Sequence, residues 1–156
     1  VICYGLVSLH CTMEEILQDY KKELEYLKNP IKPTLAIWSG LQLAAIAHSF
    51  TGDKMVENSE IDILEEGFVT LEVIQADPIL EGLNDNFICY EIHRDEAKAV
   101  PNGFELLASN EACKVQMIKK SDYPLYCTQF HPEKFNEKFQ DGKLLLRNFL
   151  NISSLF

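Results

Sequence analysis

The segment "PTLAIWSGLQLAAIAHSF", residues 33–50, constrains the fold of this chain more than any other feature. Residues 33–38 form a short apolar run typical of a buried strand. Residues 41–50 are apolar almost all round, as in a covered helix. Ala36 and Gly40 stand two residues before and two residues after Trp38. A sharp strand-to-helix turn needs small residues at those places. We therefore predict a turn of the nucleophile-elbow type with Trp38 at its tip.

The chemistry expected at this turn is incomplete. The backbone N–H groups at the start of the helix, that of Ser39 among them, point toward the tip and would help to hold an oxyanion. The indole of Trp38, however, has no usable lone pair for attack on a carbonyl. The Ser39 side chain should leave the turn in a different direction. We expect the indole to be largely buried in the space of a substrate acyl group, because exposure would forgo about 2–3 kcal/mol of burial.

The remaining elements follow from hydrophobic periodicity and turn residues. A strand over residues 1–9 precedes a helix that begins near Thr12 and Glu15, which have capping-box spacing, and ends near Lys28. Further short strands and a closing amphipathic helix are predicted over residues 68–74, 87–93, 104–110, 113–120, 125–131 and 141–152. Strand–helix–strand–helix order at the start indicates a parallel sheet. The short strands in the middle indicate an antiparallel flap or extension.

A second candidate for chemistry is "YCTQFHPEK", residues 126–134. His131 follows a predicted strand, and Glu133 comes two residues later. A carboxylate in that position can fix the tautomer of a histidine that acts as a base. The alternative interpretation is a polar strand end with a solvated carboxylate, and this stretch alone does not decide between them.

Composition excludes several partner classes and weakens the case for a metal. The net charge of −10 disfavours nucleic acid and anionic membrane surfaces, and no apolar run reaches the roughly 18 residues of a membrane span. The five cysteines form no CxxC pair, which favours reduced thiols in a cytoplasmic protein. Cys127 and His131 would lie about 13 Å apart along one strand, too far to share zinc, and the same spacing separates Cys89 from His93. His48 is expected to be a core residue.

Taken together, the two stretches resemble the class I glutamine amidotransferases, which carry a G-x-C-x-G-x-Q elbow and a distal Q-F-H-P-E. Trp38 takes the place of the nucleophilic cysteine of that family. The middle of the chain, around "IHRDEAKAVPNGFELLASN", looks most like the amidotransferase part of GMP synthases. The residues that match the two motifs are Gly40, Gln42, Gln129, Phe130, His131, Pro132 and Glu133.

The resemblance implies a single α/β domain over residues 1–156, with a mostly parallel, flavodoxin-like central sheet flanked by helices and a small antiparallel flap. It implies no cofactor and no metal, and a synthase subunit or a second copy of the chain as partner. It carries over Trp38 at the inactive nucleophile position and His131 and Glu133 as the other catalytic positions. The implied substrate pocket contains Ser39, Gly40, Gln42, His93 and Asp95.

The chain departs from the family in two further respects. Leu9 and His10 stand where the family has a Gly-Gly-Pro loop that supplies an oxyanion donor, and their side chains would crowd the backbone approach. The family also has a further strand and helix before this point, so we expect an N-terminally truncated domain. The sequence thus predicts an amidotransferase-like domain without glutaminase activity. An active enzyme with another nucleophile, or with water activated by His131, is the alternative.

Overall fold

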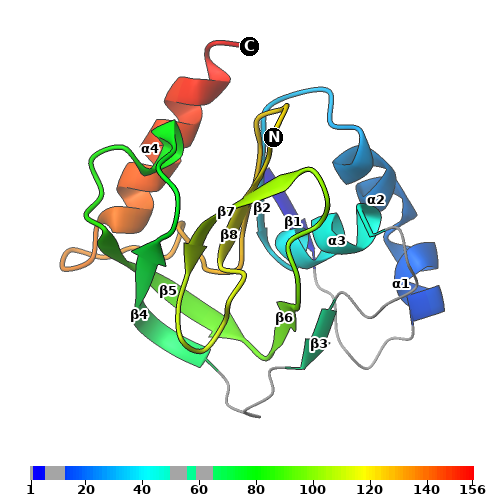
Figure 1. The fold of residues 1–156 in the computed structure, drawn as a ribbon, viewed down its shortest axis with the longest axis horizontal. Coiled ribbons are helices and arrows are strands. Elements are labelled where there is room, and N and C mark those ends of the chain that lie inside the picture. Colours follow the sequence, from blue (N-terminus) through cyan, green and yellow to red (C-terminus); the bar gives the residue numbers. More distant parts are fainter. Residues whose placement is uncertain (1, 6–12, 50–55, 59–64) are drawn as a thin grey trace.

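The computed structural model describes residues 2–5, 13–49, 56–58 and 65–156. Its centre is a seven-stranded sheet in the order β1-β2-β9-β8-β7-β4-β5 (Figure 1). The strands of this sheet are β1 (Ile2–Gly5), β2 (Thr34–Trp38), β4 (Glu65–Val73), β5 (Asn86–His93), β7 (Phe104–Ser109), β8 (Met117–Lys120) and β9 (Leu125–Thr128). The strands β3 (Val56–Asn58) and β6 (Asp95–Ala97) form a second, two-stranded sheet.

The predicted α/β class is confirmed, but the sheet is less parallel than the sequence analysis predicts. Within the described strands of the large sheet, β1 pairs with β2 and β2 with β9 in parallel. The pairs β9–β8, β8–β7, β7–β4 and β4–β5 are antiparallel. Strands joined by short connections, such as β7 and β8 or β8 and β9, can pair only as antiparallel hairpins. Most of the antiparallel strands therefore extend the main sheet, and β3 and β6 form a small, separate antiparallel pair.

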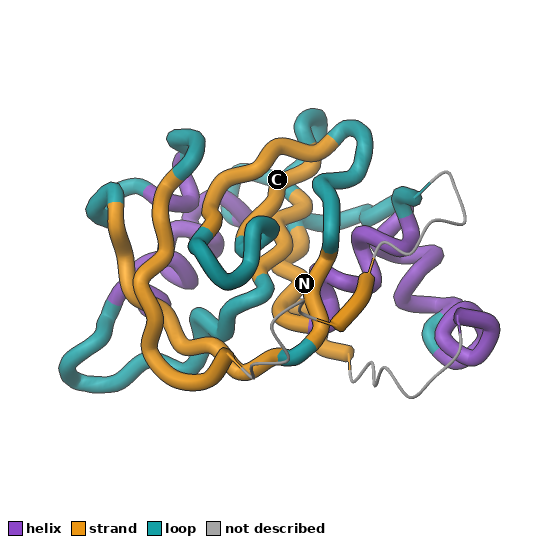
Figure 2. Tube along the Cα trace, turned by 60° about the horizontal axis from the view of Figure 1, so that its bottom comes forward, coloured by secondary structure: helices purple, strands orange, loops and turns teal. Residues whose placement is uncertain are grey.

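Helices cover both faces of this sheet, as Figure 2 shows. One face is covered by α2 (Lys21–Lys28) and α3 (Ser39–Ala47), with α1 (Met13–Asp19) beside them, and the other by α4 (Asp141–Ser153) and the short 3-10 helix η1 (Pro78–Leu80). Alternate residues of one strand serve the two cores: Ala36 packs with α2 and α3, whereas Leu35 and Ile37 pack with α4. A sheet that is buried on both faces explains why "TLAI" is buried without interruption and why Leu35, Ala36 and Ile37 are apolar in succession.

Several predicted boundaries shift in the structure. The helix predicted to run to Lys28 is divided at Tyr20, although Tyr20 N–H still donates to the carbonyl of Ile16 and the Tyr20 carbonyl accepts from Leu24. Its predicted start at Thr12 lies outside the described residues. The strand predicted over 113–120 begins only at Met117, because Asn110 Oδ1 accepts from the backbone N–H of Cys113 and holds a turn there.

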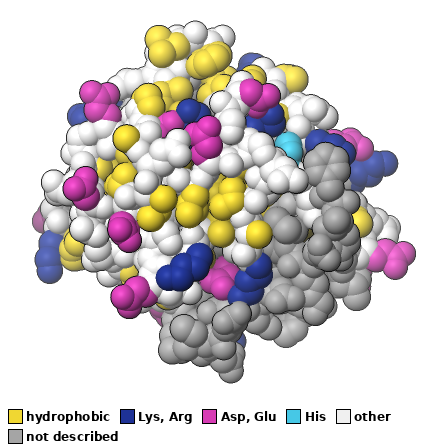
Figure 3. Space-filling model, viewed as in Figure 1, with side chains coloured by type: hydrophobic (Ala, Val, Ile, Leu, Met, Phe, Trp, Pro, Cys, Tyr) yellow, Lys and Arg dark blue, Asp and Glu magenta, His cyan; other side chains and the backbone are white. Residues whose placement is uncertain are grey.

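Further observations concern the surface, the helices and the buried side chains. On the face drawn in Figure 3, acidic and basic side chains alternate with apolar ones and do not gather in one block. None of the described helices is long and apolar enough to cross a membrane. Cys89, Cys113 and Cys127 are buried, and no disulfide joins them to one another. His48 is half-buried, with Nε2 3.0 Å from the carbonyl of Leu27 and its ring against Phe104, which fits the predicted packing role.

Candidate functional site

The turn between β2 and α3 has the strained backbone expected of a nucleophile elbow. Trp38 has φ 59° and ψ −113°, and it is the only non-glycine residue with positive φ among the described residues. A bulky residue in this region is an outlier that costs about 1–3 kcal/mol, so the surrounding structure must enforce it. The elements before and after Trp38 hold its backbone in this conformation. β2 is paired with β1 and β9, and α3 begins directly at Ser39 within the core.

The side chain of Trp38 is less buried than the sequence analysis predicts. It is partly exposed and packs against the edge of the core formed with α4. The reason is its place at the tip of the turn, beyond the last fully buried residue of β2, Ile37. The Ser39 side chain, in contrast, is fully buried, and its Oγ has no hydrogen-bond partner within the described part of the chain. An enclosed hydroxyl at this position is not presented to a substrate.

His131 lies next to this turn because β5 holds its backbone. The N–H of His131 donates to the carbonyl of Tyr90 at 2.8 Å, in an isolated antiparallel bridge beyond the end of β9. Its Nδ1 is 2.6 Å from Glu133 Oε1, and its ring is almost completely buried. Such a short contact to a carboxylate fixes the orientation of the imidazole and favours the tautomer with the proton on Nδ1.

The Trp38 indole stands beside the His131 imidazole. The two ring centroids are 5.8 Å apart, with an angle of 37° between the ring planes. The side chain at the elbow and the oriented histidine are therefore neighbours, which is the relation that nucleophile and base have in acyl-transfer sites. The indole in the first position offers no group that can form an acyl intermediate.

A hydrogen bond joins two of the predicted pocket residues, Gln42 of α3 and Asp95 of β6. Gln42 is buried, and its Nε2 donates to the carbonyl of Asp95 at 2.8 Å and to Gln129 Oε1 at 3.4 Å. The Gln42 amide thus joins the elbow helix to β6 and to the residue two positions before His131. Gly40 is buried in the first turn of α3. The Leu9–His10 segment, predicted to affect the oxyanion site, lies outside the described residues.

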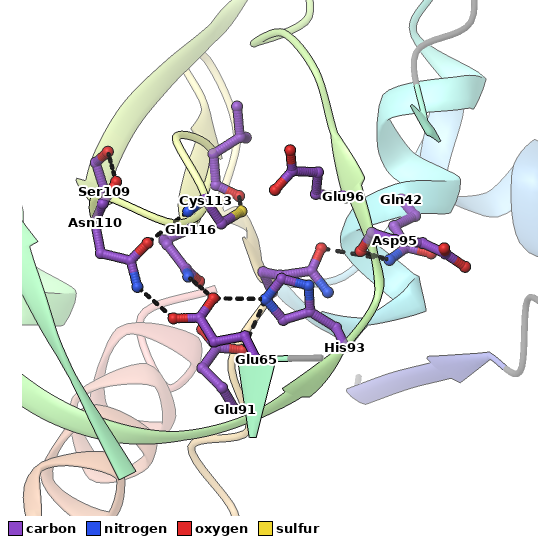
Figure 4. Close-up of polar contacts among 12 residues, drawn as sticks. Gln42, Glu65, Glu91, His93, Asp95, Glu96, Ser109, Asn110, Cys113 and Gln116 are labelled. Atoms are coloured by element: carbon purple, nitrogen blue, oxygen red, sulfur yellow. Dashed lines mark hydrogen bonds and ion pairs between the residues drawn. The ribbon is translucent and has the colours of Figure 1, made fainter. Parts of the chain in front are cut away.

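His93 lies in a separate polar cluster at the end of β5 (Figure 4). Its Nε2 is 3.0 Å from Glu65 Oε2 and 3.4 Å from Glu91 Oε2. Glu65 is fixed further by Asn110 Nδ2, which donates to Oε1 at 2.7 Å. Burial, and secondarily the charge of Glu65, raise the pKa of the Glu91 carboxyl well above its ordinary value.

Glu65 and Glu91 did not enter the predicted site. One signal for Glu91 was present in the sequence, since Phe87, Cys89, Glu91 and His93 alternate along one strand and therefore share a face. Glu65 comes from β4 and is brought opposite His93 by strand register, which the sequence alone does not reveal.

Comparison with known proteins identifies the family of the chain. The profile of the glutamine amidotransferase class-I family matches residues 13–152. A subunit of the glutamine-hydrolysing GMP synthase of Sulfolobus acidocaldarius is 36% identical over 129 residues, covering 82% of this chain and 64% of that protein. The corresponding subunit of Pyrococcus abyssi is 34% identical over 120 residues, covering 77% of this chain and 60% of that protein. The chain thus spans about three fifths of the length of these two curated relatives.

Solved structures give the same result. A Thermoplasma acidophilum protein described as a subunit of GMP synthase superposes with a TM-score of 0.76 and 31% identity, covering 91% of this chain and 67% of that one. A glutamine amidotransferase from Thermotoga maritima superposes with a TM-score of 0.73 at 17% identity, covering 97% of this chain and 74% of that one, and shows the shared fold. The profile match over most of the chain, together with the fold, shows that this chain belongs to the class I glutamine amidotransferase family.

Proposed function

We propose that this chain is an amidotransferase-like domain without glutaminase activity, which acts as a binding or regulatory module for a synthase-type partner. The observation that carries the proposal is Trp38: it occupies the strained tip between β2 and α3, and its ring lies 5.8 Å from the ring of His131. An amide can be cleaved through an acyl intermediate only if the elbow carries a nucleophile, and indole is not one.

The other candidate nucleophiles near the turn are poorly placed. Ser39 is fully enclosed. Cys127 is completely buried in β9 and packs in the core beneath α3. The histidine and its carboxylate partner remain, and in this proposal they brace the turn after β9 and hold the ring against which Trp38 packs.

The nature of the partner is proposed from the relatives. The proteins of Sulfolobus acidocaldarius and Pyrococcus abyssi are named as subunits of a glutamine-hydrolysing GMP synthase, so a second, synthase subunit is the class of partner to test first. Because the chain covers only part of their length, the activity of such an assembly is also a proposal. We expect a complex in which this domain contributes surface and no ammonia.

Catalysis is tested by ammonia release from glutamine, with the purified chain alone and with a synthase subunit from the same organism. We expect no release above that of a His131→Ala variant in either mixture. A rate that depends on His131 would overturn the proposal and favour water activated by this histidine. An active class I glutamine amidotransferase, assayed in parallel, shows that the conditions support turnover.

Association is tested separately by sedimentation of the chain with and without the synthase subunit. A defined complex supports the partner assignment, and an unrelated synthase subunit serves as the control. If the chain sediments only as a monomer in the mixture, the partner assignment is wrong even when glutaminase activity is absent. If it self-associates instead, the module is a homo-oligomer.

A further inference from the structure

The row of side chains that strand β5 directs into the protein interior ends with two titratable residues, Glu91 and His93. Phe87, Cys89, Glu91 and His93 alternate with more exposed residues and form the buried side of the strand. Glu91 therefore occupies a core position of the same row as a phenylalanine, and its side chain is completely inaccessible to solvent. A carboxylate is almost never enclosed in this way unless it is paired or coordinates a metal.

The hydrogen bonds of the described residues do not satisfy this carboxylate. Neither Oε1 nor Oε2 of Glu91 has a hydrogen-bond partner there. His93 Nε2 is 3.4 Å away from Oε2 but lies closer, at 3.0 Å, to Glu65 Oε2. Two carboxyl groups thus share one imidazole, and the cluster has more oxygen atoms than the described residues provide hydrogen-bond donors for. A divalent cation would supply what is missing.

We propose that Glu65, Glu91 and His93 form a binding site for one divalent transition-metal ion, with Zn²⁺ as the ion that the donors suit best. One atom from each side chain is available, and these three atoms lie within 4.8 Å of one another. Ligands of a tetrahedral zinc ion are about 3.3–3.4 Å apart, because each is about 2.0–2.1 Å from the metal. The two distances from His93 Nε2 already fall near this value.

To bring all three ligand atoms to the spacing of metal ligands, the Glu65 carboxylate would have to move, and its position allows this. Its side chain is the most accessible of the three, at 12%, and Glu65 is the first residue of β4. Figure 4 shows the three side chains converging from the adjoining strands β4 and β5, with Asn110 and Gln116 beside Glu65. The donation from Asn110 Nδ2 to Glu65 Oε1 leaves Oε2 directed toward His93, which is the arrangement by which outer-shell groups orient carboxylate ligands.

Gln116 provides a further polar atom at the same place. Its side chain is fully buried, Nε2 donates to Glu65 Oε2 at 3.4 Å, and its Oε1 has no hydrogen-bond partner among the described residues. An imidazole nitrogen together with carboxylate oxygens is a mixed donor set of the kind that zinc accepts, and Gln116 or water would complete four-coordination. Bound metal would fix the end of the β4–β5 hairpin next to the core.

The experiment uses the whole chain, stripped of metal with a chelator that is then removed, and titrated with Co²⁺ as a spectroscopic substitute for Zn²⁺. We expect one equivalent of Co²⁺ to give visible d–d absorption bands, and Zn²⁺ to displace it. Zn²⁺ should also raise the thermal midpoint, because a ligand that binds only the native state stabilises it.

Three variants locate the site. Glu91→Gln keeps the shape of the side chain and should weaken Co²⁺ binding by more than the roughly 10–100-fold that loss of an outer-shell partner costs. Glu65→Gln, at the more accessible position, should do the same and provides the test if Glu91→Gln does not fold. Glu96→Gln is the matched control, because Glu96 is a nearby buried carboxylate already paired with Lys98 at 2.7 Å, and it should leave binding unchanged.

Three results would overturn the assignment. One is the absence of both the cobalt spectrum and the zinc-dependent thermal shift in the folded wild-type chain. Another is binding that survives in both Glu91→Gln and Glu65→Gln. The third is a sulfur-to-cobalt charge-transfer band, which would show that cysteine thiolates hold the ion instead of the carboxylates.

Discussion

At the scale of single residues, the positive φ of Trp38 matters more for the stability of variants at this position than the loss of its side chain does. Glycine adopts positive φ without strain, whereas alanine retains the strain and has no ring to pack. We predict that Trp38→Gly is more stable than Trp38→Ala by about 1–3 kcal/mol. Urea unfolding of the two variants measures the difference directly, because both lose the same indole contact with His131. Equal stabilities would mean that the turn relaxes when the ring is removed.

Restoring a thiol at the same position should not restore an enzyme. In Trp38→Cys, the thiol would stand at a helix N-terminus beside His131, and both favour the reactive thiolate. Turnover also needs two preorganised oxyanion donors, and loss of one donor costs about 10²–10³-fold in rate. The family resemblance implies that Leu9 and His10 replace the glycines of the second donor loop, and on that basis we expect alkylation at position 38 without ammonia release from glutamine. Measurable turnover would show that this loop is no obstacle.

His48 gives the chain a specific dependence on pH. Burial lowers its pKa from 6.5, assisted by Lys120 and Lys28 and opposed by the Leu27 carbonyl and Asp122. The folded state therefore binds this proton less readily than the unfolded state. The contribution to stability is complete above the unfolded pKa and is lost as the pH falls through 6.5 toward the folded value. The free energy of unfolding should thus decrease more steeply with acidification in the wild type than in His48→Gln, and parallel curves would contradict this.

At the scale of elements, α4 is seated against the turn that carries His131. Gly142 lies in the first turn of α4, and a Cβ there would lie 2.9 Å from the Cα and 3.0 Å from the carbonyl carbon of Pro132, and would also clash with the Pro132 carbonyl oxygen. Replacing glycine by alanine inside a helix normally stabilises by about 1 kcal/mol. Here we predict that Gly142→Ala destabilises by about 1–3 kcal/mol, because the collision is with backbone. Asn151→Ala, on the exposed side of the same helix, is the control and should be neutral or slightly stabilising.

The elements that could be predicted from sequence are those with a strong hydrophobic pattern and clear signals at their ends. The strand ending at Trp38, the covered helix after it and α4 have continuous or amphipathic apolar patterns, and the structure confirms all three. Residues 113–116, with the sequence CKVQ, alternate apolar and polar as a strand does, but the hydrogen bond that Asn110 Oδ1 accepts from the backbone N–H of Cys113 makes them a turn. The short strands β3 and β6 have too few residues for any period to emerge.

The contacts of the candidate site can likewise be divided into those that are local in sequence and those that join distant residues. The turn at Trp38 and the pair His131–Glu133 are each local in sequence, so residue spacing made both of them candidates. For His131–Glu133, only the family resemblance decided in favour of a functional role. The Glu65–His93 contact and the hydrogen bond from Gln42 to the Asp95 carbonyl join residues 28 and 53 positions apart. Such contacts depend on which strands are neighbours, and the order of elements in the sequence predicts more parallel pairing than the sheet contains.

At the scale of the whole molecule, the two cores share their strands. Leu125 and Cys127 of β9 pack with the α2–α3 core, whereas Tyr126 between them packs with the α4 core. Met117 and Ile118 of β8 divide in the same way. Because neither core can lose its strands without exposing the other, the domain should unfold as one cooperative unit, as most single domains under about 150 residues do.

Two buried cysteine thiols, one in each core, allow the cooperativity of unfolding to be tested for each core separately. Cys127 belongs to the α2–α3 core and Cys89 to the α4 core, and both are almost completely inaccessible. Burial raises the pKa of the Cys89 thiol further, so in the native state it should resist alkylation. We predict that brief alkylation pulses across a urea series label both cysteines with one common midpoint, read by mass spectrometry of the separate peptides. A midpoint for Cys127 below that of Cys89 would mean that the elbow helix and its core open while α4 stays folded, and the strand-sharing that we hold responsible for cooperativity would then be insufficient.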